Sequence, residues 1–139
     1  MMEQVILWGM FAGILHFMLI GVLYNIPAVA RQYELAAQAS SAVKKWPSKT
    51  QYIVTQFLGT QIEVFILASA FFWLRPSLPL EGLSGALALG LLLALLRVYP
   101  RFWNMWIQSN YPNRLLAIEL VNGTIGTLAV ISVLEVFAK

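Results

Sequence analysis

The sequence contains no cysteine and no aspartate, and His16 is its single histidine. Without cysteine, the chain can form no disulfide, thiolate metal site, iron–sulfur cluster or cysteine nucleophile. Most hydrolytic and metal-dependent enzymes draw on the residue types that are missing or rare here. We therefore predict no catalytic residue, no cofactor-binding residue, no metal ligand and no cofactor, and we expect a protein that is not an enzyme.

Charged residues are scarce as well. They make up 11% of the 139 residues, against about 25% in a typical soluble domain. Apolar residues make up 60%, above the ~45–50% of soluble domains. So few charges leave no water-facing surface, and the composition predicts a single-domain integral membrane protein. The basic residues are spread over loops rather than gathered on one face, so we expect no nucleic-acid partner.

Four apolar runs stand out, at about 4–26, 52–74, 83–99 and 115–137. Each is close to the ~20 residues that a membrane-spanning helix needs. Because lipid offers the backbone no hydrogen-bond partners, such runs form helices. The sequence therefore predicts an all-α, polytopic fold, with residues 1–139 forming one four-helix transmembrane domain.

The connections between these runs differ in character. Residues 28–50 are polar with an amphipathic pattern, which predicts an interfacial helix between the first two spans; an irregular polar loop is the alternative. The third helix is expected to continue beyond a kink at Pro100 and then to lie in the membrane interface. Tryptophan and tyrosine favour the headgroup level, and the predicted interface aromatics are Trp46, Tyr99, Trp103 and Trp106.

Lysine and arginine are distributed unequally between the two sides of this four-helix layout. The loops after the first and third helices and their borders hold Arg31, Lys44, Lys45, Lys49, Arg97, Arg101 and Arg114, whereas the opposite side holds only Arg75 and Lys139. Positively charged loops stay in the cytoplasm. We expect a multi-pass protein of the inner (plasma) membrane with both termini on the non-cytoplasmic side.

Several polar residues interrupt the apolar runs. A rise of about 1.5 Å per residue places Glu63 and His16 near the middle of the membrane, and Arg97 and Glu119 nearer the cytoplasmic boundary. The spacing predicts a buried ion pair between Arg97 and Glu119, and an intramembrane polar seam of His16, Gln56, Thr60, Glu63 and Asn122. The seam fits a proton relay, a permeation path or a cofactor pocket; the structural alternative is a satisfied hydrogen-bond network that fixes helix register.

Two segments carry a resemblance to known proteins. "GVLYNIPAV" closes the first helix and "PNRLLAIELVNG" opens the fourth. Together with the polar first loop and the short second turn, they resemble a family of small four-helix bacterial integral membrane proteins of unknown function. The resemblance implies the four-helix architecture and a bacterial inner membrane, and it supplies no functional residue.

These observations leave three functional hypotheses. The first is a non-catalytic accessory subunit or scaffold that packs within a larger membrane complex or against copies of itself. Its partners would be the lipid bilayer and other integral membrane subunits. The second is a small transporter or channel with its polar path around Glu63. The third is a membrane enzyme or redox-cofactor carrier.

Overall fold

The computed structural model describes residues 2–138, and within that range every regular element is helical. The elements in chain order are α1 (Met2–Tyr24), α2 (Pro27–Ala39), α3 (Lys49–Leu74), a short 3-10 turn η1 (Arg75–Ser77), α4 (Gly82–Gln108) and α5 (Asn113–Phe137). Helices α1, α3, α4 and α5 are each long and apolar enough to cross a membrane. The prediction of an all-helical fold with four such helices is confirmed.

Local chemistry explains several of the helix boundaries. The Ser48 hydroxyl accepts a hydrogen bond from the backbone N–H of Gln51, at 3.1 Å, and caps α3. Pro27 begins α2, where its missing N–H costs no helical hydrogen bond. Gly82 has a φ of 57°, a left-handed conformation that glycine adopts without strain, and it turns the chain into α4.

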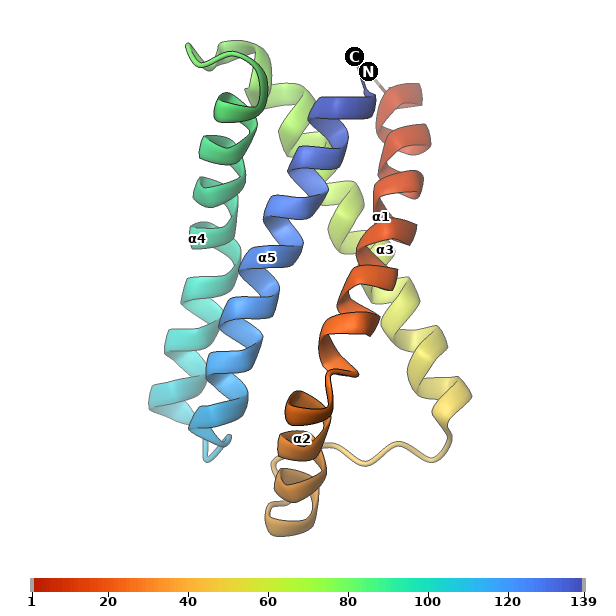
Figure 1. Ribbon diagram of the computed structural model, residues 1–139, viewed down its shortest axis with the longest axis vertical. Helices are drawn as coiled ribbons and strands as arrows, with labels where there is room; N and C mark the ends of the chain where they lie inside the picture. Colours follow the sequence, from red (N-terminus) through yellow and green to blue (C-terminus); the bar gives the residue numbers. More distant parts are fainter. Residues whose placement is uncertain (1, 139) are drawn as a thin grey trace.

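The four long helices pack in the order α4, α5, α1, α3, each against the next (Figure 1). Helices α3 and α4 meet at their short connection and then diverge toward the opposite end of the bundle, so a gap separates them there. Near the connection the core is apolar and closely packed. Its buried side chains are Ala12, Val64, Leu67, Ala68, Phe71, Ala86, Leu89, Val130, Ile131 and Leu134.

An arginine ties the α3–α4 connection to the end of α5. Arg75 Nε donates to Glu135 Oε2 at 2.8 Å, and the two side chains are only 15% and 8% exposed. The same guanidinium donates to the carbonyl oxygens of Leu80 at 2.8 Å and Gly82 at 3.1 Å. This network holds the connection closed over the core.

The two ends of the bundle differ in charge. The start of α1, the end of α5 and the α3–α4 connection share one end, whereas α2, the 40–48 loop and the α4–α5 connection share the other (Figure 1). We call the second the cationic end, because its segments carry Arg31, Lys44, Lys45, Lys49, Arg101 and Arg114.

The structure corrects two boundaries. Helix α4 continues through Pro100 to Gln108 and stays beside α5, which confirms the expected continuation beyond Pro100 and extends the predicted 83–99 span; a location of its last turns in the membrane interface stays a prediction. Between the first two spans, residues 27–39 form the expected helix, while residues 40–48 form the irregular loop that was its alternative. The interfacial location of α2 stays a prediction.

Candidate functional site

A cleft of about 840 Å³ opens at the cationic end of the bundle. All five α-helices contribute to its lining. Apolar residues such as Phe17, Ile53 and Phe102 alternate in its wall with His16 and Gln56. Its charged lining residues are Lys49, Glu63, Arg97, Arg101 and Glu119.

An arginine–glutamate pair bridges α3 and α4 across the gap. Arg97 Nε and Nη2 each lie 2.5 Å from an oxygen of the Glu63 carboxylate, so the pairing is bidentate. Arg97 Nη1 donates to the Thr127 hydroxyl at 2.5 Å, and that hydroxyl donates to the Gly123 carbonyl at 2.8 Å. The guanidinium therefore links three helices where the cleft is deepest.

The predicted ion pair between Arg97 and Glu119 is wrong. Glu119 pairs instead with Arg101, at 3.4 Å. The prediction counted the depth of Arg97 from Leu83 across roughly 30 Å of hydrocarbon and so placed it level with Glu119, but α4 continues to Gln108. The longer helix places Arg97 about 16 Å from its end, level with Thr127, which lies two turns beyond Glu119 along α5.

Two tyrosines converge on Glu119 near the mouth of the cleft. Tyr111 donates to Glu119 Oε1 at 2.6 Å, and Tyr33 donates to the same oxygen at 3.4 Å. Burial raises the pKa of each phenol above its ordinary value of 10.0, and the neighbouring Glu119 carboxylate adds to this. Both phenols therefore stay protonated at neutral pH. They attach α2 and the α4–α5 connection to the bundle.

His16 is buried between α1 and α5 beside the cleft. It lines the cleft but is only 5% exposed, and its Nδ1 has no partner among the described residues. The same holds for Asn122 Nδ2 and for both amide atoms of Gln61. Buried polar atoms in folded proteins nearly always have a partner. The His16 ring packs against the backbone of Gly126, so its Nδ1 is enclosed between α1 and α5 and does not face the cleft.

The structure divides the predicted polar seam. His16, Gln56 and Glu63 line the cleft, whereas Thr60 and Asn122 are buried outside its lining. Gln61, which the sequence analysis missed, is buried against Gly13 of α1, where an added Cβ would overlap its amide. It lies one residue after Thr60, off the helical stripe that Gln56, Thr60 and Glu63 share.

The predicted interface aromatics gather toward the cationic end. The ring centres of Trp46 and Tyr52 are 5.8 Å apart. Lys44 Nζ lies 4.3 Å from the centre of the Trp46 ring. On the exposed side of α4, Trp103 stacks on Tyr99 at 6.2 Å and lies 5.2 Å from Trp106. Their position at the headgroup level of a bilayer stays a prediction.

Comparison with protein-family models, with curated proteins and with solved structures finds no match to this chain.

Proposed function

We propose that this protein is a multi-pass protein of the inner (plasma) membrane whose cleft binds a small anionic solute during passage across the bilayer. The observation that carries the proposal is the cleft itself. Its volume of about 840 Å³ falls within the 300–1,000 Å³ typical of small-molecule sites. It contains the Arg97–Glu63 pair about midway along apolar helices, and ionisable residues at such depth usually mark a substrate or ion path.

The orientation follows from charge. The basic residues of the cationic end would be retained on the cytoplasmic side, so the cleft would open toward the cytoplasm. The start of α1 and the end of α5 would lie on the other side, where the apolar core closes the bundle. This arrangement is that of a binding site with access from one side.

The charge of the cleft favours an anion. Its lining includes three cations, Lys49, Arg97 and Arg101, and two anions, Glu63 and Glu119. In the structure Glu63 neutralises Arg97. A proton on Glu63 would remove its charge and release Arg97 to pair with an anionic solute. The anion and the proton would then move together, with no net charge left in the apolar interior.

The test is proton uptake by liposomes that contain the purified protein, driven by imposed gradients of chloride, phosphate or succinate. The wild-type protein should acidify the lumen in response to at least one of these anions, and Glu63→Gln should abolish that response. Glu81→Gln is the matched control, because Glu81 is exposed at the opposite end and should be dispensable. No flux above that of empty liposomes, or equal flux in Glu63→Gln, would contradict the proposal.

A second candidate is the accessory subunit or scaffold. The gap between α3 and α4 leaves the Glu63 side chain 39% exposed, and Gln56 is exposed on the same side. A helix from a partner or from a second copy would cover both. Purification in mild detergent distinguishes the two candidates: a stoichiometric partner that Glu63→Leu releases supports the subunit, and an active protein without one supports the transporter.

A further inference from the structure

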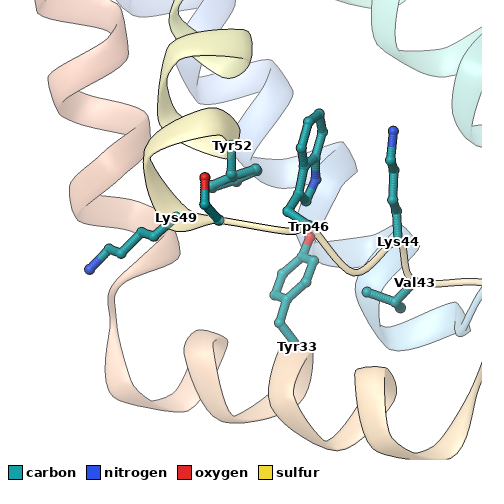
Figure 2. Close-up of a pocket in the computed structure, with 7 residues that line it drawn as sticks. Tyr33, Val43, Lys44, Trp46, Lys49 and Tyr52 are labelled. Atoms are coloured by element: carbon teal, nitrogen blue, oxygen red, sulfur yellow. The ribbon is translucent and has the colours of Figure 1, made fainter.

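A second, smaller hollow lies at the cationic end (Figure 2). It has a volume of about 470 Å³ and is lined by Tyr33, Val43, Lys44, Trp46, Ser48, Lys49 and Tyr52. We call it the mouth pocket. Its lining includes two lysines and no acidic residue. Neither lysine forms an ion pair with a described residue. The Lys44 ammonium lies over the Trp46 ring, whereas Figure 2 shows the Lys49 side chain extending away from the other labelled residues.

The mouth pocket adjoins the cleft. Tyr33, Lys49 and Tyr52 line both. Beyond these shared residues the cleft wall includes apolar side chains from three helices, among them Phe17, Ile20, Ile53, Val98 and Phe102. Lys49 and Glu63 are 14 positions apart on α3, which corresponds to about 21 Å. The mouth pocket therefore adjoins the cleft, whose wall is partly apolar.

We propose that the mouth pocket binds the phosphate of an anionic phospholipid. Basic residues beside membrane helices attract anionic lipids, and Lys49 lies at the positive end of the α3 dipole. Trp46 and Tyr52 supply the aromatic surface that is typical of the headgroup level. This inference rests on the proposed membrane insertion but not on transport.

Quenching of tryptophan fluorescence in nanodiscs tests the site. The probes are phosphatidylglycerol and phosphatidylcholine, each brominated near the headgroup and used at equal mole fraction. The contribution of Trp46 is the difference between the wild-type protein and Trp46→Phe. Phosphatidylglycerol should quench Trp46 more strongly than phosphatidylcholine does. Removing the charge of Lys44, in Lys44→Gln, should weaken this binding roughly five-fold.

Lys45→Gln is the matched control, because it removes the same charge from a neighbouring residue outside the pocket lining. Equal quenching by the two lipids, or an equal loss in Lys45→Gln, would overturn the site. Relief of the quenching by inorganic phosphate alone would assign the pocket to free phosphate and overturn the lipid assignment. A preserved preference for phosphatidylglycerol without solute flux would reject only the proposed transport.

Discussion

The bridge between Arg97 and Glu63 can be tested by a double-mutant cycle. The variants are Arg97→Leu, Glu63→Leu and the two combined. Each single substitution leaves one charged partner in an apolar surrounding, whereas the double variant leaves neither. The double variant should therefore lose less stability than the sum of the two single losses.

The expected size follows from exposure and geometry. The Arg97 and Glu63 side chains are 24% and 39% exposed and pair through two contacts of 2.5 Å. Exposed pairs contribute ~0.2–1 kcal/mol, and breaking a fully buried pair costs ~3–5 kcal/mol. A partly exposed, bidentate pair lies between these limits. We expect each single variant to lose about 2 kcal/mol, with a coupling of about 1–2 kcal/mol.

Thermal unfolding in detergent measures the effect, at about 3–4 °C per kcal/mol for a chain of this size. The control cycle pairs Arg97→Leu with Glu119→Leu. Because the structure separates these two residues, their losses should add to within ~0.3–0.5 kcal/mol. Additive losses for Arg97 and Glu63, or a larger coupling between Arg97 and Glu119, would refute the bridge.

Three further predictions concern stability. Arg75→Leu should lower the unfolding temperature strongly, since breaking the buried pair with Glu135 costs ~3–5 kcal/mol. Gly85→Ala should cost ~1–3 kcal/mol in the same thermal assay, because the added Cβ would overlap the backbone carbonyl of Leu80. The control Gly59→Ala, whose Cβ meets no atom within 4 Å, should be neutral or stabilising. Above about pH 10 the free energy of unfolding, measured by denaturant titration, should fall. The reason is that Tyr111 ionises at the ordinary phenol pKa in the unfolded state, whereas its raised pKa keeps it protonated in the folded state. The Tyr111→Phe variant should show a shallower fall.

The helices could be predicted from the sequence because their signal is local. Runs of about 20 apolar residues determine a long helix wherever they occur, and each of the four predicted spans overlaps a helix of the structure. The end of α4 was harder to place, because Pro100 and the aromatic residues after it are typical of a break. Packing against α5 keeps the segment helical, and packing between distant segments leaves no local signal.

The pairing of charges could be predicted only in part. The sequence identified Arg97, Glu63 and Glu119 as intramembrane charges, and all three line the cleft. Their partners depend on where α3 and α4 diverge, which no spacing within one helix reveals. The Arg75–Glu135 pair was missed for a related reason: Arg75 read as a loop residue, and the turn of chain that directs it toward α5 is a feature of the folded connection.

The central claim is that a polar cleft enters an otherwise apolar bundle from the cationic end. Because the chain has no cysteine, single-cysteine variants report accessibility without background. Gln56 lines the cleft, whereas Leu58 is 57% exposed and lies outside its lining. In inside-out vesicles, a membrane-impermeant thiol reagent should label Gln56→Cys and leave Leu58→Cys unlabelled. Equal labelling of the two variants, or no labelling of Gln56→Cys, would contradict the cleft.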